Sequence, residues 1–351
     1  MSVGEDDFEV IRTLGEGCFG KVILVRKMTG KDKSKEYAMK QINKGRVVHN
    51  PILKAGVMDE RDIMLQVAGV SFFPQLYYTF QTPSFLYYLM DPVDGCELFE
   101  FMNKMGVFSP EVAKFYVCQI AMILGYLHDR GIVFRDLKPE NMMVRVDTGY
   151  LQLVDFGHAT SGITDYNHKM YTFCGTRVYK SPEMVNFTEG YTWSCDWWAL
   201  GIMMYDMLYG TVPYDHPDEN VLDKMILEGK IELPKTSTKI KFDEKSWEVV
   251  QEFLHPDFNS RLGAGHDDFL EIRYHPYYSN YDWAALEAQT LPTPLGDLSQ
   301  TLVASVEPAV GFLGPCKSVS YNFDGFEYTH PSLTEDIGID DICNFQSTML
   351  Y

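Results

Sequence analysis

The stretch IVFRDLKPENMM, residues 132–143, places charged and amide side chains between two apolar runs. Charged side chains are rarely buried in a protein unless they are paired. The cluster is therefore either a surface turn or a set of groups that the fold holds in place for chemistry. Asp136, Lys138 and Asn141 fall within six residues here, and the other polar motifs of the chain decide between the two interpretations.

A further acidic side chain, Asp155, follows the apolar strand predicted for LQLV, residues 151–154. Magnesium prefers oxygen ligands and keeps substrate phosphates in its coordination shell. Phosphoryl transfer also needs a carboxylate that faces the attacking hydroxyl. The carboxylates, the amide and the lysine of these two stretches therefore match the requirements of phosphoryl transfer.

The first 90 or so residues have the pattern of strands joined by tight turns. Alternating apolar and polar residues predict strands in FEVIRTLGEG, KVILVRKM and KEYAMKQI, and FLYYLM predicts a buried strand. In GEGCFGKV, between the first two strands, Gly15, Gly17 and Gly20 let the backbone approach a phosphate. The same glycines are compatible with a simple hairpin turn. Because a strand rather than a helix follows them, they do not fit a dinucleotide-binding fold.

A lysine and a glutamate in this region form a candidate pair. Lys40 ends YAMK on the third predicted strand, and Glu60 lies twenty residues later in VMDERDIMLQV, residues 57–67. The spacing of that stretch predicts an amphipathic helix. Its apolar side consists of Val57, Ile63, Met64 and Val67. Lys40 on the strand and Glu60 on the helix could therefore pair within this part of the chain.

After Pro92–Gly95 the pattern becomes helical. The clearest helix is SPEVAKFYVCQIAMILGYLHDRG, where Ser109 suits the N-cap, Pro110 the first turn and Gly131 the end. Further helices are predicted around residues 196–209, 219–228 and 244–254. From about residue 291 the chain is loop-like, and residues 291–351 contain eight acidic residues and one base.

These patterns predict an α+β protein in three parts. They are a small β-rich lobe, a larger helical lobe and an acidic tail, at residues 1–92, 93–290 and 291–351. With 46% hydrophobic residues, the chain can form a full core. Its seven widely spaced cysteines are expected to be free thiols.

The net charge of −19 is unfavourable for binding nucleic acid or an anionic membrane surface. The longest apolar runs are too short to span a bilayer, and the acidic N-terminus MSVGEDDFEV is unlike a signal peptide. We therefore expect a cytoplasmic protein without membrane insertion, and the nucleus stays open as a second compartment. The chain is also expected to be a monomer. Its partners are expected to carry positive charge.

The motifs together resemble the signature of eukaryotic protein kinases. In order, they are the glycine loop, the strand lysine, the helix glutamate, the catalytic loop, Asp-Phe-Gly, SPE (181–183) and CDWWALG (195–201). The resemblance covers roughly residues 8–285. TFCGT (172–176) and RLGAGHDDFLEIRYHPYYSNYDW (261–283) resemble the AGC group, and within it the protein kinase C and protein kinase A-like branch.

This resemblance implies a bilobal kinase fold with an antiparallel sheet in the N-lobe, a mainly helical C-lobe and an AGC-type tail. It implies a serine/threonine protein kinase of intracellular signalling that uses ATP and Mg²⁺. Asp136 would orient and deprotonate the substrate hydroxyl, while Lys138 neutralises the γ-phosphate. Lys40 would bind the α- and β-phosphates and be held by Glu60. The remaining ligand-binding residues implied are Asn141 and Asp155 for magnesium, and Gly15, Gly17, Gly20, Val22, Ala38, Asp91, Val93 and Met143 for the nucleotide.

The resemblance also assigns substrate and regulatory positions. Glu97, Glu140 and Asp206 match acidic positions that bind substrate arginines upstream of the phosphorylated residue. Thr172 matches the activation-loop phosphorylation site, on which an upstream kinase would act, and Arg135 could pair with the phosphate. The other usual phosphate partners are replaced by Thr160 and Gly56. We therefore expect a weak dependence on that phosphate.

Two departures from the family pattern affect the catalytic and substrate loops. Phe134 stands where most kinases have histidine, and it is expected to stack with Phe156, Met64 and Leu76. GTRVY, followed by Lys180, replaces the usual GTPEY. Arg177 and Lys180 would line the normally apolar pocket for the residue after the phosphorylation site. Polar or acidic residues should be tolerated or preferred there.

The tail stretch FDGFEY, residues 323–328, resembles the hydrophobic motif of the AGC group, with Glu327 at the usual phosphorylated position. Two other interpretations stay open. The tail could be disordered, or Phe323 could be the aromatic residue that closes over adenine. Two alternatives to an active protein kinase also remain. These are a pseudokinase that binds nucleotide or a partner as a scaffold, and a small-molecule kinase of related fold, which TFCGT and SPE disfavour.

Overall fold

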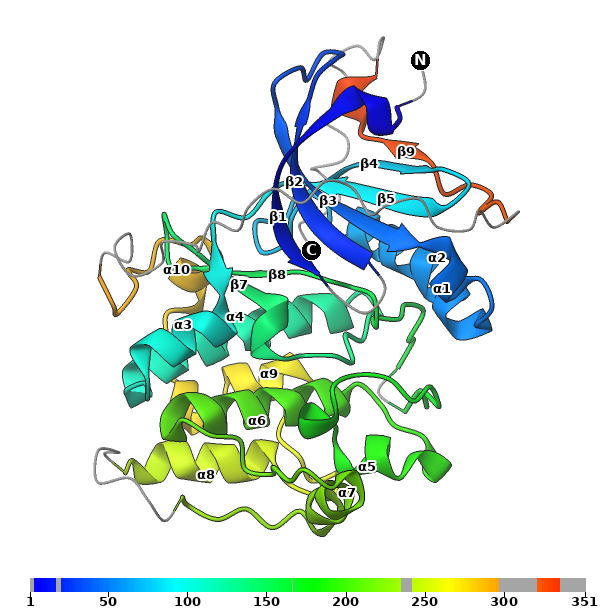
Figure 1. Cartoon of the computed structure of the whole chain (residues 1–351). Coiled ribbons are helices and arrows are strands. Elements are labelled where there is room, and N and C mark those ends of the chain that lie inside the picture. The colour runs from blue at the N-terminus through cyan, green and yellow to red at the C-terminus, as the bar shows by residue number, and fades with distance from the viewer. Residues whose placement is uncertain (1–2, 17–19, 166, 235–241, 297–320, 335–351) are drawn as a thin grey trace. The chain divides into compact units, whose positions relative to one another are not determined.

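The structure is a computed structural model, and it describes residues 3–16, 20–165, 167–234, 242–296 and 321–334 (Figure 1). The chain divides into two compact units. Of the described residues, the first unit holds 3–16, 20–68, 74–92 and 321–334, and the second holds 69–73, 93–165, 167–234 and 242–296.

The first unit is built on a six-stranded sheet with the order β1-β2-β3-β5-β4-β9. All its neighbouring strands are antiparallel. The strands are β1 (Phe8–Glu16), β2 (Gly20–Lys27), β3 (Glu36–Asn43), β4 (Leu76–Gln81), β5 (Phe85–Met90) and β9 (Tyr328–Thr329). The four strands predicted from the sequence are confirmed, whereas β4 and β9 were not predicted. A buried cluster rich in aromatic residues packs on this sheet, and it includes Phe8, Tyr37, Tyr78 and Phe80.

Two helices belong to the same unit, α1 (Lys44–Val47) and α2 (Pro51–Gln66). Helix α2 begins six residues before the predicted start because Asn50 caps it. The Asn50 side-chain oxygen accepts hydrogen bonds from the backbone N–H groups of Ile52 and Leu53 at 2.9 and 3.3 Å. The predicted apolar side is confirmed: Val57, Ile63, Met64 and Val67 are all buried.

The second unit is mainly helical (Figure 1). Its helices are α3 (Leu98–Met105), α4 (Pro110–His128), α5 (Pro182–Val185), α6 (Ser194–Tyr209), α7 (Glu219–Glu228), α8 (Glu244–Phe253), α9 (Phe269–Arg273) and α10 (Trp283–Glu287). A small sheet consists of β6 (Gly95–Glu97), β7 (Met142–Arg145) and β8 (Leu151–Leu153). The four helices predicted from the sequence are confirmed within two residues at each end.

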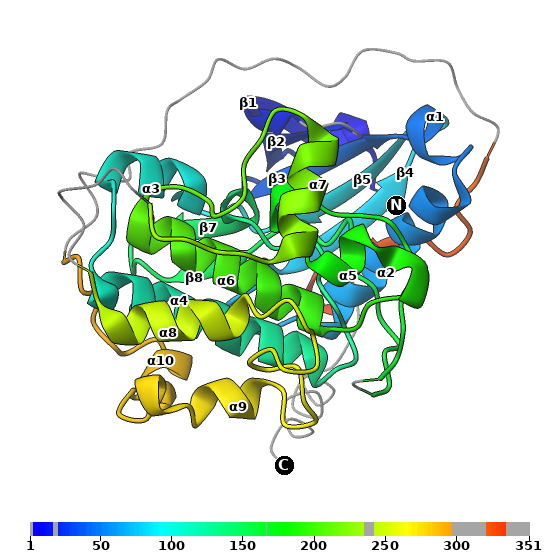
Figure 2. The ribbon, with the colours of Figure 1, turned by 90° about the horizontal axis from the view of Figure 1, so that it is seen from below.

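Helix α6 packs between α4 and α8 (Figure 1), and the view from below shows α6 running alongside α8 (Figure 2). Every residue of α6 except Asp206 is buried, as expected for a helix that is apolar on all sides. The approach of α8 is close, because a Cβ added at Gly201 would lie 2.7 Å from the Cβ of Phe253. Polar groups on α6, such as Asp196, are therefore held in a rigid and dry setting.

The described residues bear on two expectations for the whole chain, free cysteine thiols and the absence of a membrane-spanning helix. The four cysteines among them, Cys96, Cys118, Cys174 and Cys195, are free thiols, as predicted. Within the same residues, no helix combines the length and the apolar character needed to cross a bilayer.

Candidate active site

Asp136 is 7% exposed and its two carboxylate oxygens have separate partners. Its Oδ1 accepts hydrogen bonds from the backbone N–H and the hydroxyl of Thr176, at 2.7 and 2.8 Å. Its Oδ2 accepts one from the side-chain amide of Asn141 at 3.2 Å and lies 3.3 Å from the ammonium of Lys138. These donors fix the orientation of the carboxylate.

Thr176 is a functional residue that the sequence did not single out, although it lies inside the quoted motif TFCGT. Its hydroxyl donates to Asp136 and accepts a hydrogen bond from the ammonium of Lys138 at 3.0 Å. The threonine thus joins the two residues predicted to act on the hydroxyl and on the phosphate. Only the tertiary structure brings it there, because forty residues separate it from Asp136.

The predicted magnesium ligands lie on two connected loops. The backbone N–H of Val154 donates to the carbonyl of Asn141 at 2.9 Å. Asp155, the next residue, is exposed and has a φ of 65°, a left-handed conformation that is uncommon for a non-glycine residue and clusters at functional sites. No group of three histidine, cysteine or acidic side chains suited to a metal ion occurs in the described residues. One carboxylate and one amide nevertheless suit magnesium, which takes its other ligands from phosphates and water.

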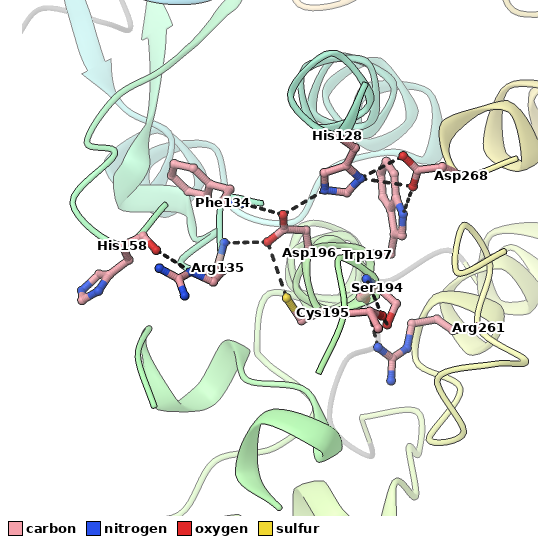
Figure 3. A network of polar contacts seen from close by, with 11 residues as sticks. His128, Phe134, Arg135, His158, Ser194, Cys195, Asp196, Trp197, Arg261 and Asp268 are labelled. Carbon is pink, nitrogen blue, oxygen red and sulfur yellow. Dashed lines mark hydrogen bonds and ion pairs between the residues drawn. The ribbon is translucent and has the colours of Figure 1, made fainter. Parts of the chain in front are cut away.

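A buried network holds the backbone before Asp136 (Figure 3). The carboxylate of Asp196, on α6, accepts the backbone N–H groups of Phe134 and Arg135, both at 2.8 Å. Its Oδ2 also lies 3.0 Å from Nε2 of His128, at the end of α4. Arg135 has a φ of 66°. The network therefore stabilises a strained turn next to the predicted catalytic base.

His128 connects that carboxylate to a second one. Its Nδ1 lies 3.0 Å from Oδ2 of Asp268, and Oδ1 of Asp268 accepts the indole N–H of Trp197 at 2.7 Å. Burial alone would lower the pKa of His128, but Asp268 and Asp196 outweigh it and raise the pKa to about 10. The imidazole is thus a buried cation between two carboxylates. Sequence reasoning missed this network: Asp196 and Asp268 lie in the quoted motifs CDWWALG and RLGAGHDDFLEIRYHPYYSNYDW, but nothing in the sequence connects either motif to His128.

Phe134 packs as predicted against Phe156, with ring centroids 5.9 Å apart and an interplanar angle of 87°. The edge-to-face arrangement is favourable for two aromatic rings. Its predicted contacts with Met64 and Leu76 stay predictions. The replacement of histidine therefore preserves packing against the Asp-Phe-Gly motif.

In the first unit the predicted Lys40–Glu60 ion pair is present. The ammonium lies 2.5 Å from the carboxylate of Glu60, which is 3% exposed. In the β2–β3 pair, Lys40 lies opposite Val22, and in the β3–β5 pair, Ala38 lies opposite Met90. This register places Lys40 and two predicted nucleotide-binding residues, Val22 and Ala38, on the neighbouring strands β2 and β3.

The predicted glycine loop is described in part. Gly15 lies in β1 and Gly20 begins β2, while Gly17 lies outside the described residues. Gly20 is required sterically, because an added Cβ would lie 1.7 Å from the carbonyl oxygen of Gln41. The other predicted nucleotide-binding residues, Asp91, Val93 and Met143, lie just after β5, before β6 and on β7 respectively.

The three predicted substrate-binding acids lie on β6, on the 3₁₀ turn Pro139–Asn141 and on α6. Burial, with help from Glu140, raises the pKa of Asp206 to about 6. Burial followed by Glu100 and Glu140 raises the pKa of Glu97. In addition, Oε2 of Glu140 is buried and accepts no hydrogen bond from the described residues. A group of carboxylates that repel one another is complementary to a cation.

The activation segment, which contains Thr172, is tied to the catalytic loop. Arg135 donates from Nε to the carbonyl of His158 at 2.7 Å and from Nη2 to that of Ala159 at 3.3 Å. Its Nη1 donates to the hydroxyl of Tyr191 at 3.4 Å, and that hydroxyl donates to the carbonyl of Thr172 at 2.7 Å. Three of the five N–H donors of the predicted phosphate partner are thus already engaged.

The resemblance to protein kinases also implies an ion pair between Glu183 of SPE and Arg261, and this pair is present and bidentate. The two N–O distances are 2.6 and 2.9 Å, and Arg261 is only 2% exposed. Burial raises the pKa of Glu183, but the Arg261 guanidinium outweighs it, so that the pKa lies below its usual value. The pair connects the end of the activation segment to the chain after α8.

The tail stretch 323–328 packs on the first unit, in which Phe323 and Phe326 are 3% and 0% exposed. The ring of Phe326 lies edge-on to Tyr88, with centroids 5.2 Å apart. Gln81 donates to the carboxylate of Glu327 at 2.7 Å. After it, β9 extends the sheet beside β4. This position fits the predicted docking of a hydrophobic motif, and it places Phe323 against Phe326 and Lys44.

Comparison with known proteins identifies the class. The protein kinase domain family matches residues 8–278, so the chain belongs to the protein kinase family. Among its relatives is ribosomal protein S6 kinase alpha-6 of Danio rerio, 38% identical over 287 residues, which cover 82% of this chain and 37% of that protein. Ribosomal protein S6 kinase alpha-2 of Mus musculus is 34% identical over 337 residues, covering 96% and 42% of the two chains.

The chain thus spans about two fifths of the length of the curated relatives that it matches. The resemblance to a protein kinase and the α+β kinase fold are confirmed. The similarity to ribosomal S6 kinases agrees with the resemblance to the AGC group, while the expected protein kinase C branch stays a prediction.

Proposed function

We propose that the chain is a serine/threonine protein kinase that transfers the γ-phosphoryl group of ATP to proteins with arginines upstream of the acceptor. The single observation that supports it best is the arrangement around Asp136. A carboxylate oriented by Thr176 and Asn141, with the Lys138 ammonium beside it, is what transfer to a hydroxyl requires. Family membership and similarity to ribosomal S6 kinases support the same activity.

In the proposed mechanism Asp136 accepts the proton of the substrate hydroxyl and holds the hydroxyl in line for attack. Lys138 neutralises charge on the transferred group, and Lys40, oriented by Glu60, binds the α- and β-phosphates. Asn141 and Asp155 supply the oxygen ligands for magnesium, which when bound provides positive charge against the phosphates. The Asp196 network keeps the catalytic loop in its strained conformation before substrate binds.

Substrate choice is proposed to depend on Glu97, Glu140 and Asp206. A guanidinium from the substrate would pair with these carboxylates through charge-assisted hydrogen bonds and relieve their mutual repulsion. Thr172 is the proposed site for an upstream activating kinase, and the enzyme is proposed to act as a monomer.

The test is transfer of radiolabelled phosphate from ATP to a peptide with upstream arginines. Asp136→Asn keeps the shape of the side chain but removes the base, so we expect activity to fall by about a thousandfold or more. A wild-type chain that binds ATP without transferring phosphate would favour the scaffold alternative. Transfer to a small metabolite but not to the peptide would favour a small-molecule kinase.

A further inference from the structure

Lys180 is a buried cation that pairs with no carboxylate of the described residues. The residue is 5% exposed, and its ammonium lies 3.4 Å from the ring centroid of Phe173. Burial lowers the pKa of Lys180, with only weaker opposing effects from acidic groups. Burying an ammonium is unfavourable unless an anion compensates it. The aromatic ring supplies only part of that compensation.

The neighbouring cation, Arg177, is already neutralised. Its guanidinium forms ion pairs with Glu219 and with Asp223 of α7, the latter at 3.3 Å. Both acids come from the same unit, so Arg177 is available to a substrate only at the expense of these pairs. Of the two basic residues predicted to line the pocket after the phosphorylation site, Lys180 is therefore the better anion-binding group.

The position of Lys180 relates it to the reacting hydroxyl. A small cavity of the second unit is lined by Lys180, Asp136 and Thr176, among others. A residue next to an acceptor hydroxyl bound at Asp136 is only one Cα spacing, about 3.8 Å, further along the peptide. A side chain on that residue could therefore reach Lys180.

The direction along the substrate is the one that the family resemblance predicts, in which Lys180 lines the pocket for the residue after the phosphorylation site. Lys180 follows the 3₁₀ turn Arg177–Tyr179 in extended conformation, with φ −69° and ψ 137°. The upstream arginines are proposed to bind Glu97, Glu140 and Asp206, so Lys180 is assigned to the residue downstream of the acceptor.

We propose that Lys180 is a specificity-determining residue that binds the carboxylate of an acidic residue immediately after the phosphorylated serine or threonine. Phe173 is 54% exposed, so a substrate side chain has access to its ring and to the ammonium beside it. A charged hydrogen bond stabilises the ammonium more than contact with one aromatic face. This inference rests on the proposed kinase function and adds a second feature to its substrate class.

The experiment compares two peptides with the same upstream arginines that differ only in glutamate or leucine after the acceptor serine. The wild-type chain should prefer the glutamate peptide by about tenfold or more in kcat/KM. Lys180→Leu should abolish or reverse the preference. Lys169→Leu is the matched control, since the Lys169 ammonium also lies over a phenylalanine ring, that of Phe258, at 4.2 Å. It should keep the preference.

Other outcomes overturn the inference. A wild-type preference for leucine, or an unchanged glutamate preference in Lys180→Leu, would show that the ammonium does not bind the residue after the acceptor serine. If Lys180 instead held a phosphate on Thr172, the variant would lower activity equally on both peptides. A peptide with phosphoserine after the acceptor tests whether phosphate replaces carboxylate, and a preference for it over glutamate would refute an acidic residue as the natural ligand.

Failure of the proposed function would be recognisable separately, because no peptide would then be phosphorylated. In that case, fluorescence anisotropy of the two labelled peptides measures binding alone. Tighter binding of the glutamate peptide by the wild-type chain and not by Lys180→Leu would support the site without catalysis. Equal binding of both peptides would refute it.

Discussion

Replacing His128 by glutamine should remove a buried cation without opening a large cavity. In the wild-type chain both ring nitrogens contact carboxylates, Nε2 that of Asp196 and Nδ1 that of Asp268, at 3.0 Å each. The histidine side chain is completely buried. In His128→Gln these two carboxylates would face a neutral amide, so part of their burial would be uncompensated.

The magnitude follows from the pKa. Burial opposes protonation, but Asp268 and Asp196 raise the pKa of His128 from 6.5 to about 10. At about 1.36 kcal/mol per pH unit this corresponds to roughly 5 kcal/mol of stability. Removing one partner of a buried ion pair costs about 3–5 kcal/mol. We therefore expect His128→Gln to lose about 3–5 kcal/mol in free energy of unfolding near pH 6.

The pH dependence tests the reasoning further. Because the pKa is higher in the folded than in the unfolded chain, the stabilisation is complete below pH 6.5. It is lost as the pH rises through 10, with about half remaining near pH 8. Urea unfolding of both proteins between pH 6 and 10 should show their difference in free energy shrinking over that range.

A matched control is His266→Gln, since the side chain of His266 is 86% exposed, and we expect a change within about 0.5 kcal/mol. A difference for His128→Gln below about 1 kcal/mol, or one of constant size from pH 6 to 10, would refute a protonated histidine between the two carboxylates. If the variant cannot be purified folded, the pH dependence of wild-type unfolding provides the same test.

Three further changes probe the tail, the peptide site and the activation segment. Phe326→Ala should cost about 3–5 kcal/mol of stability and speed hydrogen exchange in residues 321–334; unchanged exchange would show that the ring does not anchor the tail. Burial and a neighbouring carboxylate raise the pKa of Asp206 to about 6. KM for an arginine peptide should therefore fall from pH 5 to 7 as Asp206 ionises. A KM that does not change with pH would argue against Asp206 as an arginine-binding residue. Tyr191→Phe removes hydrogen bonds and should lower kcat by about tenfold. Thr172→Ala should lower kcat by less. A complete loss of activity in Thr172→Ala would contradict the weak dependence on the Thr172 phosphate.

The sequence was most informative where local pattern and tertiary packing agree. The long helix from Pro110 to His128 was predicted with its cap because serine, proline and a dense apolar run all mark the same boundary. Strand β9 was not predicted, because two residues in an acidic tail become a strand only by pairing with β4. The sequence pattern places the start of α2 six residues too late, because the apolar periodicity begins at Val57 whereas Asn50 caps the helix earlier.

Within the candidate site, sequence motifs located residues but not their contacts. Asp136 and Lys138 were predicted from their spacing, yet Thr176, which joins them, is remote in sequence. The pair Lys40–Glu60 was predicted because a strand and a helix each presented one charge. His128 had no such signal, since a lone histidine near a helix end gives no indication of two distant carboxylates.

The activation segment shows why residue type alone is insufficient. Arg135 was predicted to pair with a phosphate on Thr172, but three of its five N–H donors are already bonded to the carbonyls of His158 and Ala159 and to Tyr191. A phosphate would have to compete with these bonds, so its net contribution is reduced. The hydroxyl of Tyr191 also holds the carbonyl of Thr172, which ties the segment to the catalytic loop before any phosphate is added. Weak dependence on the phosphate therefore has a second cause besides the missing basic partners, and that cause is visible only in the folded chain.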